Sequence, residues 1–342
     1  MKVLTRIFLV LLGTLTLMLF IYHFGPKPGR PVIDITMPPE PADLTKLEDS
    51  LNRHEASLPV KPGDAAEILW AGKGTHTRTH LALIYLHGFT ASHEEGMPLH
   101  KEFATRYGMN LLLSRLSGHG LSVAEPLLDL TADRLYNSAK AALATGSRLG
   151  DSVILMATSA GAALALELAA KEKGVPIKAL LLYSPCIRIF DPNAWVLGGP
   201  WGLQLAHQIT GSKYLYSTRK DSATARYWYV KYRIEGAVAL EQLLENEMIQ
   251  ARFRQVTVPV LTCMYYKDKV HQDSTVKTES IRWMNARLGT PAALKKLEVL
   301  PDAGDHVIAC YLRSKDLPAV RTATFSYAEN VLGLKPVVGL LK

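Results

Sequence analysis

The chain has 342 residues, of which 48% are hydrophobic and 20% are charged. That length and composition suit one large α/β domain with an insertion or two ordinary domains, and they exclude a chain that is disordered beyond its ends. The net charge of +8 does not predict nucleic-acid binding, because half of it comes from four basic residues before position 31 and no cluster of Lys and Arg interleaved with aromatic residues follows.

The first predicted element is an apolar helix within residues 1–24. Lys2 and Arg6 precede an uncharged run that begins at residue 7 and extends to Phe24. At 1.5 Å per residue, these 18 residues cover about 27 Å, just enough to span the hydrocarbon core of a bilayer. No small-residue cleavage pattern follows. We therefore expect an uncleaved signal anchor that attaches the protein to a membrane, with a cleaved signal peptide or a surface helix as alternatives.

The basic residues before this helix predict its orientation. Lys2 and Arg6 favour an N-terminus in the cytoplasm, so the rest of the chain would lie outside the cytoplasm. In a bacterium, this predicts a single-pass protein of the inner membrane with its main domain in the periplasm. A secreted protein is the alternative.

Residues 25–64 are predicted to form a linker and an N-terminal extension. Six prolines between positions 26 and 41 favour a stiff, extended chain. A helix is expected over 43–55, where leucines recur at helical spacing.

From about residue 67 the sequence alternates between apolar strands and helices, which predicts an α/β fold with a mostly parallel sheet flanked by helices. This core is expected to comprise residues 65–185 and 258–342. Its expected strands are 81–86, 110–115, 152–156, 179–183, 258–265 and 294–300, and its expected helices are 95–107, 130–149 and 160–174.

Residues 186–257 interrupt this alternation. The segment combines helical fragments with glycines at 198, 199 and 211, and it is rich in Trp and Tyr. An insertion of about 70 residues is too long for a simple connection in a compact α/β unit. We therefore expect this segment to form a structured, mainly helical cap.

The sequence ATSAG at 157–161 lies where a predicted strand runs directly into an Ala-rich helix. A sharp turn at this point would project the hydroxyl of Ser159 out of the sheet, and it requires small neighbours, which Ala157 and Gly161 provide. Ala157 stands where such turns usually have glycine. We predict that Ser159 is a catalytic nucleophile, which needs an adjacent base. A serine that caps an ordinary helix is the alternative.

His306 is the predicted base, because it follows the final strand and a loop there can return it to the C-terminal edge of the sheet. Asp268, just after the strand that ends near Tyr266, is predicted to orient the imidazole and stabilise its charged form. Asp273 and Asp305 compete for this role. Asp273 is expected to begin a helix instead, and Asp305 is adjacent to His306 in the sequence, which makes the hydrogen bond awkward.

The segment HGFTAS at 87–92 directly follows another predicted strand. Its backbone N–H groups can face the nucleophile, and we predict that the N–H groups of Phe89 and Ala160 form the oxyanion hole. Ser92 and Glu95 have the spacing of a capping box and are expected to start the next helix.

The remaining candidates for metal or redox chemistry are few. Cys186, Cys263 and Cys310 lack short metal-type spacing, and we predict no structural disulfide between them. His76 and His80 lie in a Thr/Gly setting that is typical of an exposed loop. We therefore predict no metal site and no cofactor.

Taken together, HGF, SGHG, ATSAG, Asp268 and His306 resemble the α/β-hydrolase superfamily over about residues 65–330. Within it, HGFTAS followed by RLSGHG is similar to the group of monoacylglycerol lipases, carboxylesterases and serine aminopeptidase-like proteins. The resemblance implies a cap after the sixth strand, which the segment 186–257 matches. It also implies cofactor-independent acyl transfer to water through an acyl-serine. The implied roles are nucleophile for Ser159, base and acid for His306, orienting group for Asp268, and oxyanion donors for Phe89 and Ala160.

These features predict a membrane-anchored serine hydrolase, a carboxylesterase or lipase that acts on small acyl esters or lipids. An amidase or aminopeptidase is the second enzyme hypothesis. It would need a site for the amino group of its substrate, for which the sequence offers Glu235, Glu241, Glu245 and Glu247. A catalytically silent binding protein of the same fold is the non-enzyme alternative.

Overall fold

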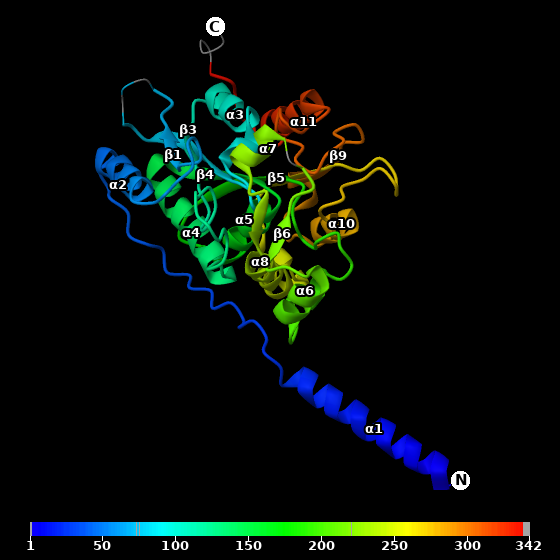
Figure 1. Cartoon of the computed structure of the whole chain (residues 1–342). Helices are drawn as coiled ribbons and strands as arrows, with labels where there is room; N and C mark the ends of the chain where they lie inside the picture. Colours follow the sequence, from blue (N-terminus) through cyan, green and yellow to red (C-terminus); the bar gives the residue numbers. More distant parts are fainter. Residues whose placement is uncertain (1, 73, 75, 220, 338–342) are drawn as a thin grey trace.

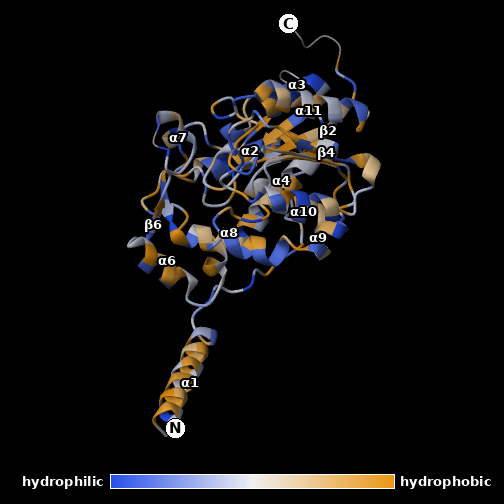
Figure 2. Cartoon of the chain, turned by 90° about the vertical axis from the view of Figure 1, so that its right-hand side faces the viewer, coloured by the Kyte–Doolittle hydropathy of each residue, from blue (hydrophilic) through white to orange (hydrophobic). Residues whose placement is uncertain are grey.

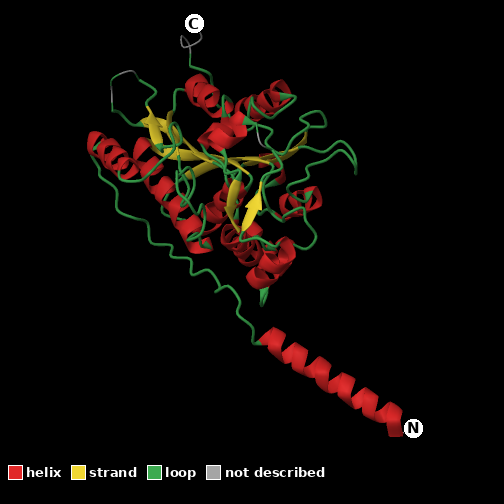
Figure 3. Ribbon diagram, in the orientation of Figure 1, coloured by secondary structure: helices red, strands yellow, loops and turns green. Residues whose placement is uncertain are grey.

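The computed structural model describes residues 2–72, 74, 76–219 and 221–337. Within these residues, seven strands form the main sheet in the order β1-β3-β2-β4-β5-β8-β9. Figure 3 shows the strands in yellow at the centre of the body, with helices in red around them. Every neighbouring pair is parallel except β1 and β3, which confirms the mostly parallel sheet expected from the sequence. The strands are β1 (Glu67–Leu69), β2 (Thr79–Leu86), β3 (Asn110–Leu113), β4 (Gly150–Thr158), β5 (Ile177–Tyr183), β8 (Val260–Met264) and β9 (Lys295–Val299).

Helices cover both faces of this sheet (Figure 1). One core cluster joins one face of the sheet to α3 and α11, and a larger cluster joins the other face to α4, α5 and α10. The helix α2 packs beside β1 and α4. Their bounds are α2 (Leu44–Ala56), α3 (Leu99–Tyr107), α4 (Ala132–Leu149), α5 (Ala160–Lys171), α10 (Thr278–Arg287) and α11 (Leu317–Asn330).

The strand β2 shows why the central strands read as uninterrupted apolar runs. Ala82, Ile84 and Leu86 belong to the larger core cluster, whereas Leu83 and Tyr85 belong to the smaller one. Successive side chains of a strand point to opposite faces, and here both faces are covered by helices. A buried parallel strand therefore needs an apolar residue at every position.

The predicted helix over 95–107 is divided in the structure. A short 3-10 helix, η1 (His93–Gly96), is followed by Pro98, and α3 begins only at Leu99. Proline lacks the N–H that a continuous helix would need at this position. The capping box predicted from Ser92 and Glu95 is wrong, because Ser92 makes no side-chain cap and the carboxylate of Glu95 accepts a hydrogen bond from the N–H of Gly88.

The cap lies between β5 and β8 in the chain, and its elements α6, β6 and α8 lie in the lower part of the body in Figure 1. It is inserted after the fifth strand of the chain where the sixth was expected, because only the short β1 precedes β2 and β3. The cap also contains a two-stranded antiparallel sheet beside its helices. Its elements are η2 (Ala194–Gly198), α6 (Gly202–Thr210), β6 (Tyr214–Tyr216), α7 (Ser222–Tyr227), β7 (Lys231–Arg233), α8 (Ile234–Glu247) and α9 (Gln250–Gln255). A further short 3-10 helix in the core, η3 (Ala292–Leu294), precedes β9.

The N-terminal helix α1 (Lys2–His23) projects away from this body (Figure 1). Within the described residues, it is the one helix that is long and apolar enough to cross a membrane. The extended segment that follows lies along α4, where the Asp133 carboxylate accepts from the N–H of Val32 and the Arg148 guanidinium donates to the carbonyl of Glu40 at 3.1 Å. The segment predicted as a linker is therefore attached to the body by hydrogen bonds.

Candidate active site

Ser159 occupies the turn between β4 and α5 with φ 53° and ψ −116°. A positive φ is uncommon for a residue with a side chain and costs conformational energy, so the surrounding structure must hold it. The N–H of Ser159 donates to the carbonyl of Tyr183 at 2.9 Å, and its own carbonyl accepts from the N–H of Cys186 at 3.0 Å. The turn therefore has the strained strand-to-helix geometry that exposes a serine at the end of a sheet.

Gly161 permits the close approach of α5 to the end of β2. A Cβ atom added at this position would lie 2.2 Å from the carbonyl oxygen of Leu86 and 2.5 Å from that of His87. Ala157, at the other side of the turn, is fully buried. The small residues on either side of Ser159 thus meet the packing requirement expected from the sequence.

His306 lies in the loop between β9 and α11 and pairs with Asp273. Its Nδ1 atom is 2.6 Å from Oδ2 of Asp273. The other carboxylate oxygen, Oδ1, accepts from the N–H groups of Thr275 at 2.8 Å and Val276 at 3.1 Å. Because Nδ1 is engaged by the carboxylate, Nε2 is the ring nitrogen left to act on a hydroxyl.

The prediction that Asp268 orients His306 is wrong. The Asp268 side chain is 52% exposed and contacts the imidazole of His271 at 3.0 Å, whereas the Asp273 side chain is 0% exposed. An antiparallel bridge between Tyr266 and Gln272 explains the difference. It closes a narrow loop that places Asp268 at its exposed tip and Asp273 at its buried base. Asp273 accordingly does not begin α10, which starts at Thr278.

The sequence contains one signal that argues against Asp268. Asp268 stands between Lys267 and Lys269, a charged setting that is typical of an exposed turn. Asp273 is followed by Val276, which belongs to the buried core. Polarity alone does not select Asp273, because its own neighbours, Gln272 and Ser274, are also polar.

The electrostatic surroundings of His306 favour its protonated form. Burial lowers the pKa of the imidazole, but the charge and hydrogen bond of Asp273 outweigh it, and Glu95 adds to the effect. The pKa of His306 is consequently raised above 6.5. A raised pKa makes the ring a stronger proton acceptor once it is neutral.

The other two histidines near Ser159 are poor candidates for a base. His87 is fully buried, and burial lowers its pKa well below 6.5. Its Nε2 atom accepts from the N–H of Leu116 at 3.0 Å. Burial also lowers the pKa of His119 to about 4. Both rings support the loop after β2.

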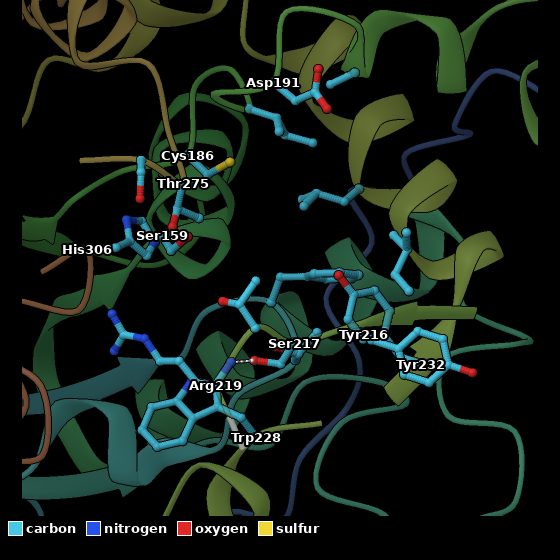
Figure 4. Close-up of a pocket in the computed structure, with 18 of the residues that line it drawn as sticks. Ser159, Cys186, Asp191, Tyr216, Ser217, Arg219, Trp228, Tyr232, Thr275 and His306 are labelled. Carbon is cyan, nitrogen blue, oxygen red and sulfur yellow. Dashed lines mark hydrogen bonds between the residues drawn. The ribbon is translucent and has the colours of Figure 1, made fainter. Parts of the chain in front are cut away.

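Ser159 and His306 line the same cavity and lie beside each other in Figure 4. Within the described residues, no hydrogen bond joins the two side chains. Such bonds between nucleophile and base commonly tighten only in the complex with substrate. The structure thus contains the histidine–carboxylate pair and places the serine against the same space.

Glu95 is a buried acid at this site that the sequence analysis assigned to a capping role. Its Oε2 atom accepts from the N–H of Gly88 at 2.5 Å, and the carboxyl group lines the cavity. A Cβ atom on Gly88 would lie 2.8 Å from Oε2 of Glu95 and 3.1 Å from Cβ of Ser159. Burial raises the pKa of Glu95 to about 7, against the opposing effect of the Gly88 N–H. The spacing from Ser92 concealed this role.

The structure places the two predicted oxyanion donors, Phe89 and Ala160, in the loop after β2 and at the start of α5. Ala160 is the first residue of α5, so its N–H has no partner within the helix. Phe89 directly follows Gly88, whose N–H is occupied by Glu95, and it lines the cavity. Its ring contacts the rings of His119 and Tyr232 edge to face. These contacts connect the loop after β2 to the cap.

The cavity has a volume of about 980 Å³ and lies between the carboxyl edge of the sheet and the cap. Apolar and aromatic side chains from η2, α6, β6 and α8 line its cap side (Figure 4). Sites for small molecules are typically concave and apolar with a few polar groups. The glutamates considered for an amino-group site, Glu235, Glu241, Glu245 and Glu247, do not line it.

Comparison with known proteins agrees with this geometry. Residues 83–317 match the family described as the alpha/beta hydrolase family. No curated protein sequence matches the chain. Because the structural similarities below have identities under 25%, they concern the fold alone.

Three solved structures illustrate the similarity. The metagenome-derived lipolytic enzymes LipS and LipT are represented by a chain with 17% identity and a TM-score of 0.63, covering 79% of this chain and 99% of that one. A soluble variant of monoglyceride lipase from Saccharomyces cerevisiae, solved with a substrate analogue, has 13% identity and a TM-score of 0.58, with coverages of 78% and 90%. The monoacylglycerol lipase of Paleococcus ferrophilus has 12% identity and a TM-score of 0.56, with coverages of 79% and 98%.

Proposed function

The chain belongs to the alpha/beta hydrolase family, and from this premise we propose that it is a membrane-anchored serine hydrolase that cleaves acyl esters. The observation that carries the proposal is the convergence of two features on one cavity. These are the strained turn at Ser159 and the buried pair of His306 and Asp273. Fold alone does not define an activity, so the proposal depends on these side chains.

In the proposed first half-reaction, Oγ of Ser159 attacks the carbonyl carbon of the ester while Nε2 of His306 accepts the hydroxyl proton. Asp273 holds Nδ1–H and stabilises the imidazolium. The N–H groups of Phe89 and Ala160 stabilise the negative charge on the carbonyl oxygen. The C–O bond then breaks, His306 returns its proton to the leaving alcohol, and the acyl group stays on Ser159.

In the second half-reaction, water takes the place of the alcohol. His306 accepts a proton from the water molecule as its oxygen attacks the acyl carbon. The same oxyanion donors stabilise the second tetrahedral intermediate. Its collapse returns the proton to Oγ of Ser159 and releases the carboxylic acid, so the enzyme is regenerated without a cofactor.

An acyl ester is the substrate class that the cavity favours. Its cap side is lined by apolar residues such as Val196, Leu197, Ile209 and Leu240. An acyl chain gains about 0.8 kcal/mol for each methylene group buried against such a surface. The similar solved structures include proteins described as lipases and esterases, which is consistent with this choice.

The membrane anchor is the second part of the proposal, and it rests on α1. Its orientation follows from Lys2 and Arg6, which favour a cytoplasmic N-terminus and a hydrolase domain on the other side of the membrane. Retention of the full chain in membranes after an alkaline carbonate wash would test this part, and release into the supernatant would contradict it.

Labelling with a fluorophosphonate tests the nucleophile directly. The wild-type chain should become labelled at Ser159, and Ser159→Ala should not react. Cys186→Ser provides a matched control, because Cys186 lines the same cavity and should leave labelling unchanged. An unreactive wild-type chain would contradict a serine hydrolase and favour a binding protein.

A substrate panel then separates ester from amide hydrolysis. We expect turnover of p-nitrophenyl esters of graded chain length, with a preference for acyl chains longer than acetyl because the cavity is apolar. Aminoacyl-anilides should be poor substrates. Faster cleavage of the anilides would favour an aminopeptidase instead.

A further inference from the structure

The cap exposes three large apolar side chains beside the cavity. Trp195 is 57% exposed, Leu205 is 42% exposed and Ile209 is 81% exposed. Leu205 and Ile209 are four residues apart on α6 and so share one face of that helix. We call these three residues the cap apolar face. The sequence of α6, GLQLAHQIT, contains no Asp, Glu, Lys or Arg, although the helix lies at the surface.

The start of α6 is joined to the end of α1. The backbone N–H of Trp201 donates to the carbonyl of Pro26 at 2.7 Å, and its indole N–H donates to the carbonyl of Ile21 at 3.0 Å. The backbone of Gly25 lies against the same indole, since a Cβ atom there would be 1.8 Å from Nε1. Figures 1 and 2 both show α6 in the part of the body nearest to α1.

The segment between α1 and α2 fixes this junction against the body. Beyond the Val32 and Glu40 contacts with α4, the Nζ atom of Lys140 donates to the carbonyl of Asp34. Thr145 on α4 also donates to the Glu40 carboxylate at 3.1 Å. These bonds hold the segment that follows the junction along α4.

The Trp201 contacts place the start of α6 beside the end of the apolar N-terminal run. The apolar run ends at Phe24, one residue after α1, which is the expected end of the hydrocarbon region. The headgroup layer on each side of the hydrocarbon is about 5–7 Å deep. Trp side chains, such as Trp195 and Trp201, are enriched in this layer.

The cavity reaches the surface at the same place. Ala206 and Ile209 of α6 line the cavity that also contains Ser159 and His306, and Ile209 is largely exposed. A route lined by protein therefore connects the cap apolar face to the site of reaction. Figure 2 shows hydrophobic residues on α6 on the side of the body from which α1 extends.

We propose that the cap apolar face is a membrane-contact surface, which rests on the bilayer that α1 spans and admits acyl chains from that bilayer into the cavity. The occupant of this face is a phospholipid surface. The inference rests on the proposed function, both for the anchor and for ester hydrolysis. It goes further by assigning the substrate to the class of bilayer-resident acyl lipids.

Depth-dependent quenching tests the contact. The Ile209→Cys variant of the full chain is labelled with an environment-sensitive fluorophore and reconstituted in vesicles of phosphatidylcholine and phosphatidylglycerol. Val270→Cys, at an 83% exposed apolar residue in the loop after β8, is the matched control. The three native cysteines are buried, which favours selective labelling. A nitroxide lipid labelled near its headgroup should quench residue 209 by about half, because a surface of this kind enters the headgroup boundary, and should leave residue 270 bright.

The outcomes separate the contact from the anchor. A bright label at residue 209, in protein that stays in the vesicles after a carbonate wash, would overturn the contact surface while leaving the anchor intact. Release by the wash would overturn both. Fluorophosphonate labelling of Ser159 is independent of either result, so failure of the hydrolase proposal would be recognised separately.

An activity comparison tests the entry route. Trp195→Glu with Leu205→Glu alters two residues that do not line the cavity. The two carboxylates remove apolar contact and are repelled by anionic phosphatidylglycerol, so hydrolysis of a long-chain ester embedded in the vesicles should fall about tenfold. Hydrolysis of soluble p-nitrophenyl butyrate should stay unchanged, which also shows that the variant is folded. An unchanged ratio between the two substrates would overturn the entry route.

Discussion

Nδ1 of His306 lies 2.6 Å from Oδ2 of Asp273, although the two residues are 33 positions apart in the sequence. The carboxylate is fully buried and is fixed by two backbone N–H groups from Thr275 and Val276. It therefore cannot rotate away from the ring without losing hydrogen bonds. This pair determines the tautomer of His306 and directs Nε2 to the role of base.

The buried acid Glu95 should make the stability of the protein depend on pH. Burial raises the pKa of Glu95 from 4.5 to about 7. Below about pH 4.5 the Glu95 carboxyl group is protonated in both the folded and the unfolded state. Between about pH 4.5 and 7 it is protonated only in the folded state, so the free energy of unfolding falls as the pH rises. Glu95→Gln should remove this loss and gain up to about 3 kcal/mol relative to the wild type between pH 5 and pH 8. Urea denaturation at a series of pH values measures this difference in the free energy of unfolding.

Glu94→Gln is the control for this measurement. The carboxylate of Glu94 accepts from the Tyr311 hydroxyl at 3.1 Å at the exposed side of the same turn. Its curve of unfolding free energy against pH should run parallel to that of the wild type. A parallel curve for Glu95→Gln as well would contradict the burial of an ionisable acid at this position.

Glu95→Gln should also move the acid limb of the profile of activity against pH. His306 must be neutral to accept a proton, so kcat/KM rises as pH passes through its pKa. Burial lowers that pKa, while Asp273 and then Glu95 raise it. Removing the charge of Glu95 should therefore shift the limb to lower pH. A shift to higher pH would mean that Glu95 does not act on the imidazole through its charge.

Gly161→Ala should damage the turn that carries Ser159. The added methyl group would lie 2.2 Å from a backbone carbonyl oxygen, which cannot move without displacing β2. We expect a loss of about 1–3 kcal/mol in the free energy of unfolding and a large loss of hydrolysis. Thermal unfolding and ester turnover measure the two effects.

Gly174→Ala is the matched control for this substitution, because no atom lies within 4 Å of the added Cβ atom. It should leave both thermal unfolding and ester turnover close to the wild type. Equal effects at the two glycines would argue against a packing requirement in the turn.

Tyr229 should couple the cap to the loop after β3. Its hydroxyl accepts from the N–H of Leu121 at 2.8 Å and donates to the carbonyl of Gly118 at 2.9 Å. Tyr229→Phe leaves these groups unpaired and should cost about 1–3 kcal/mol of stability. Tyr216→Phe, at an exposed tyrosine of β6, should cost almost nothing in the same urea titration. A neutral Tyr229→Phe would show that the bonds are dispensable.

Much of the fold was accessible from the sequence, because strands buried on both faces must be apolar throughout. The turn at Ser159 was equally clear, since only small residues fit where α5 crosses β2. The partner of His306 could not be identified from the sequence, because chain order allows any aspartate in the loop after β8. The choice depends on the bridge between Tyr266 and Gln272, a tertiary pairing that periodicity does not reveal.

The most direct test of the central claim compares Asp273→Asn with Asp268→Asn by measuring kcat/KM on a p-nitrophenyl ester. Asparagine at residue 273 keeps the shape but favours the wrong tautomer of His306, so activity should fall about 10³–10⁴-fold. Asp268→Asn should stay within about threefold of the wild type, because its exposed side chain faces His271. Retained activity in Asp273→Asn, with a large loss in Asp268→Asn, would contradict the account.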